Sequence, residues 1–149
     1  MKLVEEGVRE STWRSDKGSL KIQRPCPHVV VFVESGYLDA EFAPPIEDAS
    51  NQALAEAGTS NLHLFVDAYD LTGYAPKVRK NPTNWLMAHR NRVEVQHMLV
   101  RSKITKMGLS VASLALGGLI QGHSSRAAFQ VALDETVRTL RSSFPPPSA

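Results

Sequence analysis

The sequence predicts an α/β fold in which a mixed, mainly parallel sheet of four or five strands carries helices mainly on one face. Three observations favour this class. Short apolar runs that end at acids or glycines alternate with longer segments of helical periodicity. The length of 149 residues suits one domain with a single core. Successive strand–helix units imply parallel strands joined by right-handed crossovers.

The stretch from Asn61 to Tyr74 is the centre of this prediction. An apolar run containing Phe65 and Val66 reaches Asp67, and a glycine-bearing turn follows. This pattern is typical of a buried strand, here 61–67, whose carboxyl end comes to the surface. Sites in open α/β sheets are built at that end.

Two strands precede the central one. Residues 1–18 mix charges with apolar residues without a firm period, which predicts a flexible N-terminal arm. A hairpin follows from residue 19, with its second strand at 28–33 and a turn at Arg24-Pro25-Cys26-Pro27, whose prolines donate no ladder bonds. Ser35 to Asp39 is expected to turn the chain out of that second strand.

The first two helices are marked by prolines. Pro44 and Pro45 suit the first turn of a helix, and Gly58 is a good end signal. After the central strand we expect a basic loop, and then a helix that begins at Asn81-Pro82, with a capping side chain and a proline at its first position.

The last third of the chain repeats the alternation. We expect a strand at 95–100, a helix from Ser102 to Leu116, a short strand at 119–121 and a final helix. The core side of the final helix is expected to carry Phe129, Ala132, Leu133, Val137 and Leu140. The order is then ββαβαβαβα, with one domain at 19–142 and a disordered proline-rich tail at 143–149.

Charge is strongly segregated along the chain although the net charge is only +2. Glu34 to Asp70 holds eight acids and no base, whereas Lys77 to Lys106 holds eight bases and one acid. Such segregation can steer an anionic partner or pair with a second copy, and it can equally reflect two solvated helix faces. Because no apolar signal region or bilayer-length stretch is seen, we expect a cytoplasmic protein.

Three segments taken in order resemble the SpoIIAA-like or STAS/SEC14-type small α/β domains. They are Leu64-Phe65-Val66-Asp67 followed by Asp70-Leu71-Thr72-Gly73-Tyr74, then Trp85-Leu86 with His89-Arg90, and then His97-Met98-Leu99-Val100-Arg101-Ser102. The resemblance covers about Leu20 to Leu140. It implies helices packed mainly on one side of the sheet and a regulatory or binding role without chemistry of its own.

Anti-sigma-factor antagonists of this fold carry an Asp-Ser pair at the start of the helix after the central strand, and the serine is phosphorylated. The matching position here is Ala75-Pro76, where neither residue accepts a phosphate. The resemblance therefore implies a domain without the usual phosphorylation switch. Thr72 and Ser102 remain hydroxyls at strand ends, where such groups usually satisfy backbone atoms.

Other chemistry has weaker support in the sequence. Asp67 and Asp70 can act as paired carboxylates for a cation or for acid–base work, or Asp70 can simply stabilise the turn near Thr72. The five histidines, at 28, 63, 89, 97 and 123, lack zinc-site spacing, and His63 and His97 are expected to be packed in strands. The basic residues suit phosphates, but no exposed aromatics are interleaved with them, so nucleic acid is not expected.

We therefore expect a non-catalytic regulatory or scaffold domain, of the kind used in bacterial signalling, that binds a protein partner or its own copy in a salt-sensitive way. No cofactor and no metal are expected. The alternative is a SEC14-like carrier of a small apolar molecule, with a pocket under the helix 102–116 and a gate at 72–80. The expected partner-binding residues are Asp67, Asp70, Thr72, Tyr74, Lys77, Arg79, Lys80, His89, Arg90, Arg92, Arg101 and Lys103.

Overall fold

The computed structural model describes residues 1–7, 9–102 and 117–144. The elements are β1 (Lys2–Glu6), β2 (Glu10–Arg14), β3 (Gly18–Cys26), β4 (Val29–Leu38), the 3₁₀ turn η1 (Ala40–Phe42), α1 (Ala43–Glu56), β5 (Leu62–Tyr74), α2 (Pro76–Ala88), the 3₁₀ turn η2 (Arg90–Arg92), β6 (Val93–Leu99), β7 (Ile120–His123) and α4 (Arg126–Ser143). The helix expected at 102–116 lies almost wholly outside the described residues.

A seven-stranded sheet forms the middle layer, with its strands in chain order from β1 to β7. The pairs from β1 to β4 are antiparallel, and those from β4 to β7 are parallel. The predicted mixed α/β fold is confirmed, but the described sheet has seven strands instead of the four or five expected, and half of its pairs are parallel. The two strands beyond the expected order of elements, β1 and β2, come from the segment predicted to be a flexible N-terminal arm.

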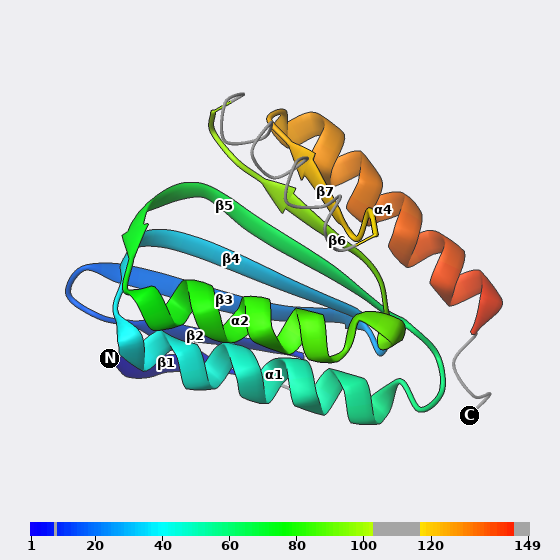
Figure 1. Cartoon of the computed structure of the whole chain (residues 1–149), viewed down its shortest axis with the longest axis horizontal. Coiled ribbons are helices and arrows are strands. Elements are labelled where there is room, and N and C mark those ends of the chain that lie inside the picture. The colour runs from blue at the N-terminus through cyan, green and yellow to red at the C-terminus, as the bar shows by residue number, and fades with distance from the viewer. Residues whose placement is uncertain (8, 103–116, 145–149) are drawn as a thin grey trace.

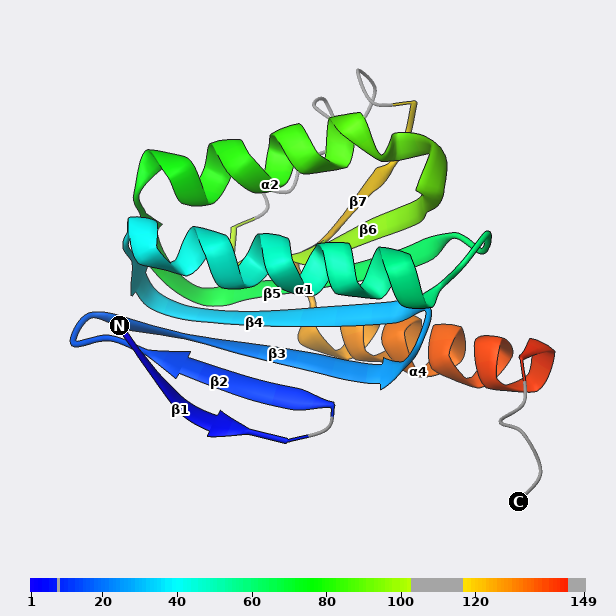
Figure 2. The same cartoon turned by 90° about the horizontal axis from the view of Figure 1, so that it is seen from below.

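The described helices cover both faces of the sheet unequally. Helices α1 and α2 lie side by side on one face, and α4 lies on the other (Figures 1 and 2). The larger core, between the sheet and α1 and α2, includes Phe32, Phe42 and Trp85. The smaller core under α4 includes Phe65 and Phe129. All five residues predicted for the core side of α4 pack into it.

The central strands are longer than the sequence predicted. β4 continues through the expected turn to Leu38, and β5 continues past Asp67 to Tyr74. Glycine was read as a turn signal, but Gly36, at φ 70°, and Gly73, whose Cα faces the Tyr37 ring, lie within paired strands. Glycine in a strand often marks a bulge or a close approach, and the β4–β5 register shifts twice here.

Helix α2 begins six residues before the predicted Pro82 and contains that proline in its interior. An internal proline removes one backbone hydrogen bond and costs about 3 kcal/mol. The buried side chains of Val78, Trp85 and Leu86 attach the helix to the core on both sides of Pro82. Tertiary burial therefore outweighs the local proline signal, and the expected basic loop is the first part of this helix.

At Gly18, the first residue of β3, the backbones of β3 and β4 approach closely. A Cβ placed on Gly18 meets Tyr37 O and lies 2.8 Å from Ser35 O, which are backbone atoms of the paired strand. We expect Gly18→Ala to lower the free energy of unfolding by about 1–3 kcal/mol, measured by urea denaturation, because the backbone has to shift. Gly7→Ala is the matched control, since its nearest atom is Glu10 O at 3.6 Å. Equal stability of the two variants would contradict the close approach.

Candidate functional site

A cluster of charged and aromatic side chains lies on β5 beside the point where the parallel strands β6 and β7 end. Asp67, on β5, is 7% exposed and accepts from the Arg126 guanidinium at 2.7 Å. Its other carboxylate oxygen accepts from the Tyr69 backbone N–H at 3.1 Å. Arg126 is the first residue of α4, so this ion pair joins the central strand to the start of that helix.

The second predicted acid, Asp70, has a different environment. It is exposed and pairs with Arg101 at 3.1 Å, while the Arg101 Nε donates to Tyr69 O at 3.2 Å. The Tyr69 ring has the guanidinium carbon of Arg101 at 4.4 Å from its centroid and that of Arg126 at 5.2 Å. Each aspartate is therefore paired with its own arginine, which is not the arrangement of two carboxylates sharing a cation. No group of three His, Cys, Asp or Glu suited to a metal occurs among the described residues.

Glu34 is a buried acid to which the sequence pattern assigns no role. It lies on β4 and is 9% exposed. Burial, and to a smaller degree the negative charge of Asp67, raise the pKa of the Glu34 carboxyl from its ordinary 4.5 to about 7. The sequence signal was an acid within an apolar strand, but only the fold shows that it is buried beside a second acid.

Two of the scattered histidines meet on the face covered by α4. His97 Nδ1 lies 2.9 Å from His123 Nε2, and the His97 ring stacks on Phe65 at 4.5 Å. Burial, followed by the nearby His123 and His63, lowers the pKa of His97 to about 4. Packing of His97 within a strand, as the sequence predicted, is confirmed by its exposure of 8%.

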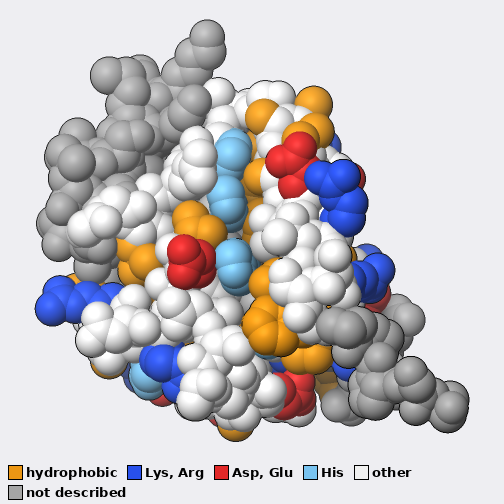
Figure 3. All heavy atoms as spheres, turned by 90° about the vertical axis from the view of Figure 1, so that its right-hand side faces the viewer, with side chains coloured by type: hydrophobic (Ala, Val, Ile, Leu, Met, Phe, Trp, Pro, Cys, Tyr) orange, Lys and Arg blue, Asp and Glu red, His pale blue; other side chains and the backbone are white. Residues whose placement is uncertain are grey.

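Histidines also gather where the parallel strands begin. His28 directly precedes β4 and His63 lies near the start of β5. Seen from the side where α1 and α2 end, histidine side chains gather near the middle of the surface (Figure 3). Burial lowers the pKa of His63, and its Nδ1 is buried without a hydrogen-bond partner in the described part of the chain.

The predicted basic residues divide between the two ends of α2. Lys77, Arg79 and Lys80 are exposed on its first two turns, next to Thr72 and Tyr74 at the end of β5. Tyr74 is 43% exposed. The exposed tyrosine of the adjacent strand, Tyr37, was not predicted, because the sequence placed it in a turn.

Two of the predicted residues after the end of α2, His89 and Arg92, make contacts within the chain. His89 stacks on Trp85 with the ring centroids 4.3 Å apart, and its Nδ1 lies 2.8 Å from Trp85 O. Arg92 donates to Gly58 O and Ser60 O, which ties η2 to the connection before β5. Arg90 is exposed nearby. A helix of thirteen residues separates the two groups by roughly 20 Å, so they do not form one compact site. Lys103 lies outside the described residues.

Acidic residues lie beside the basic end of α2. Helix α1 carries Glu47, Asp48 and Glu56 and no base, and the described part of α2 carries no acid. The two helices are in contact, and Trp85 Nε1 donates to Asn51 Oδ1 at 2.7 Å. The charge segregation of the sequence is therefore kept in space as neighbouring helices of opposite sign.

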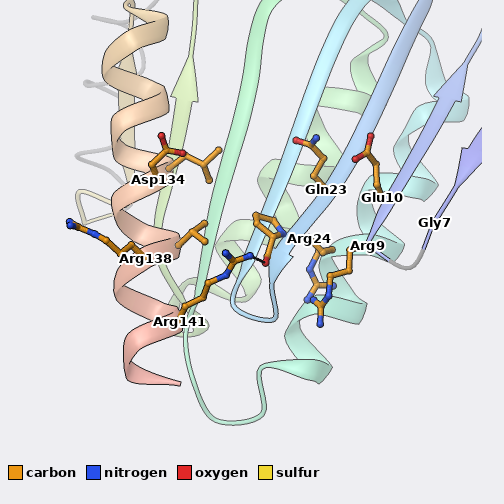
Figure 4. Close-up of a pocket in the computed structure, with 11 residues that line it drawn as sticks. Gly7, Arg9, Glu10, Gln23, Arg24, Asp134, Arg138 and Arg141 are labelled. Carbon is orange, nitrogen blue, oxygen red and sulfur yellow. Dashed lines mark hydrogen bonds between the residues drawn. The ribbon is translucent and has the colours of Figure 1, made fainter. Parts of the chain in front are cut away.

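An open groove of about 900 Å³ lies between α4 and the strands β2 and β3. Leu133, Val137 and Pro25 supply apolar surface. In Figure 4, Arg9 and Arg24 lie on the strand side and Arg138 and Arg141 come from α4. The Arg24 guanidinium is held by Glu56 and by Pro27 O, and Arg141 donates to Pro25 O.

Comparison with known proteins places the fold. No family model matches the sequence, and no curated protein matches it. An uncharacterized protein of the DUF3478 family with a SpoIIAA-like fold, from Shewanella loihica PV-4, superposes with a TM-score of 0.60 at 16% identity, over 91% of this chain and 98% of that one. An anti-sigma factor antagonist from Mycobacterium paratuberculosis superposes with a TM-score of 0.50 at 15% identity, over 81% and 97%.

The chain therefore has the SpoIIAA-like fold that the sequence resemblance predicted. At these identities the similarity concerns the fold alone. Helix α2 begins at Pro76 with Ala75 as its N-cap, so the start of the helix after the central strand is where the resemblance placed it. No described helix combines the length and the apolar character needed to cross a bilayer.

The pKa values of Glu34 and His97 predict opposite effects on stability. The raised pKa of Glu34 makes folding bind a proton, so stability falls as pH rises from 4.5 to about 7, by about 3 kcal/mol in total. The lowered pKa of His97 makes folding release one, so stability falls as pH drops from 6.5 to about 4. We expect the two effects to offset one another in the native protein between pH 4.5 and 6.5.

Glu34→Gln is expected to remove the loss of stability that the raised pKa of Glu34 causes as pH rises. Its free energy of unfolding, measured by urea denaturation across this range, should rise with pH, because the lowered pKa values of His97 and His63 are then no longer offset by Glu34. Glu135→Gln, an exposed change on α4, is the control and should follow the native profile. Parallel profiles for Glu34→Gln and the native protein would show that Glu34 titrates normally.

Proposed function

We propose that this chain is a non-catalytic regulatory or scaffold domain of the cytoplasm that acts by binding a protein partner or its own copy. The observation that carries the proposal is the exposed surface at the start of α2. Lys77, Arg79 and Lys80 form no ion pair in the described part of the chain, and the exposed Tyr74 directly precedes this helix. Unpaired cations beside an exposed aromatic ring suit a protein interface.

The fold is in keeping with this role, because one structure that shares it is an anti-sigma factor antagonist. The start of α2 lacks the residue that a phosphorylation switch would need there, since Ala75 and Pro76 carry no hydroxyl. Arg126 pairs with Asp67 and Arg101 pairs with Asp70, which disfavours a catalytic role for these two carboxylates.

Charge reversal on α2 tests the proposed interface. We expect the protein, purified gently from its source cells, to carry a protein partner in native mass spectra that dissociates as salt is raised, because exposed charges are screened over about 8 Å at physiological ionic strength. Lys77→Glu/Lys80→Glu should lose that partner. Lys2→Glu/Arg14→Glu, which makes the same charge change on β1 and β2, should keep it. Retention by both variants would exclude this surface.

A second candidate function, a carrier for a small ligand, is favoured by the groove beside α4. The pocket expected under 102–116 concerns residues that are largely outside the described part, and the expected gate at 72–80 is made mainly of strand and helix. The groove beside α4 lies on the face of the sheet opposite to α1 and α2 (Figure 2). It combines an apolar floor with Arg9 and Arg138, which form no ion pair in the described part.

This groove predicts binding of an amphiphilic anion. We expect dansyl-undecanoic acid to gain fluorescence on titration with the protein. Arg9→Glu/Arg138→Glu should weaken the binding roughly tenfold or more, because the carboxylate of the ligand then has no cation from Arg9 or Arg138 beside it. Arg14→Glu/Arg79→Glu, at positions outside the groove, should bind like the native protein. Equal affinities for all three proteins would remove the groove as the binding site.

A further inference from the structure

Helices α1 and α2 form a surface with two parallel stripes of opposite charge. Both helices follow a parallel strand and run back along the same face of the sheet, so they point the same way (Figures 1 and 2). The outward side of α1 carries the exposed Glu47 and Asp48. The outward side of α2 carries the exposed Lys77 and Lys80, with Met87, 52% exposed, two turns beyond Lys80.

The two stripes do not neutralise each other within the chain. None of the five ion pairs formed by the described residues includes these four charged side chains, and none of the four is hydrogen-bonded there. The contact between the helices is made by other groups, such as the hydrogen bond from Trp85 to Asn51. The charged ends therefore remain available to a partner.

The stripes lie at the same height along the helices. The hydrogen bond from Trp85 to Asn51 sets the level of one helix against the other. Four residues before Asn51 on α1 is Glu47, and four residues before Trp85 on α2 is Asn81, so Glu47 and Asn81 lie at the same level. Glu47 and Lys80 therefore differ in level by one residue, or roughly 1.5 Å of helical rise. An axis parallel to the helices preserves this level when it brings two copies together.

We propose that a second copy of this chain docks on the α1–α2 surface about a two-fold axis parallel to the two helices. This axis places α1 of each copy on α2 of the other, so acids meet bases at both contacts, as a closed, self-complementary dimer requires. A two-fold axis across the helices would place acid on acid and base on base. Met87 supplies apolar surface within the same contact. The inference rests on the proposed function and names the chain itself as the partner.

Two complementary variants test the dimer. Glu47→Lys/Asp48→Lys makes both stripes basic, and Lys77→Glu/Lys80→Glu makes both acidic. By sedimentation velocity of the purified full chain at low ionic strength, we expect the native protein to be a salt-sensitive dimer and each variant to associate roughly tenfold or more weakly. An equal mixture of the two variants should form a heterodimer, because opposite stripes then face each other at both contacts.

The controls separate folding from association and this inference from the broader function. Lys2→Glu/Arg14→Glu should dimerise like the native protein, and circular dichroism should be unchanged for all variants, since the altered side chains are exposed. A native monomer, or a variant mixture that stays monomeric, overturns the inference. If the native protein is a monomer and Lys77→Glu/Lys80→Glu loses a different protein, the self-docking fails and the proposed function stands. A dimer that the swapped pair restores supports the inference whether or not another protein is found.

Discussion

The parallel pairing of β4 with β5 is the interaction on which the rest of the structure depends. It runs from Val29 opposite His63 to Leu38 opposite Tyr74, and both cores are built on it. On one face Val30, Phe32 and Leu64 support α1 and α2, while on the other Val31 and Phe65 support α4. Because alternate residues of a strand point to opposite faces, a shift of one residue in this register would exchange the two cores.

The same pairing places two acids, Glu34 on β4 and Asp67 on β5, next to the buried apolar part of the two strands. Glu34 and Asp67 are neighbours near the end of the buried region, but they are stabilised differently. Asp67 has Arg126 and a backbone N–H as partners, whereas burial, and to a smaller degree the charge of Asp67, raises the pKa of Glu34 to about 7. An acid beside another acid in a desolvated position is favoured in its neutral form. Asp67 is therefore held by an ion pair, whereas burial favours the neutral form of Glu34.

Charge on the helical face follows from the way the crossovers are made. α1 leads from β4 to β5 and α2 from β5 to β6, so a helix that carries acids and a helix that carries bases become neighbours. The ion pairs of Arg126 and Arg101 lie elsewhere, at strand ends on the other side of the sheet, and Arg24 of β3 pairs with Glu56 only at the last residue of α1. The outward charges of α1 and α2, namely Glu47, Asp48, Lys77 and Lys80, form no ion pair in the described part of the chain, and the proposed dimer uses them.

The sequence by itself determined the fold class, the parallel centre of the sheet, the end of α1 near Gly58 and the core side of α4, because hydrophobic periodicity is a local property. Only the tertiary structure decided the strand pairing of residues 2–14, the continuation of β5 to Tyr74 and the passage of α2 through Pro82, since each depends on contacts between distant segments. The candidate site divides in the same way. Local sequence marked Asp67, Asp70 and the cations of α2, whereas the arginine pairing of each aspartate, the burial of Glu34 and the acidic neighbour of α2 follow from strand order and helix packing.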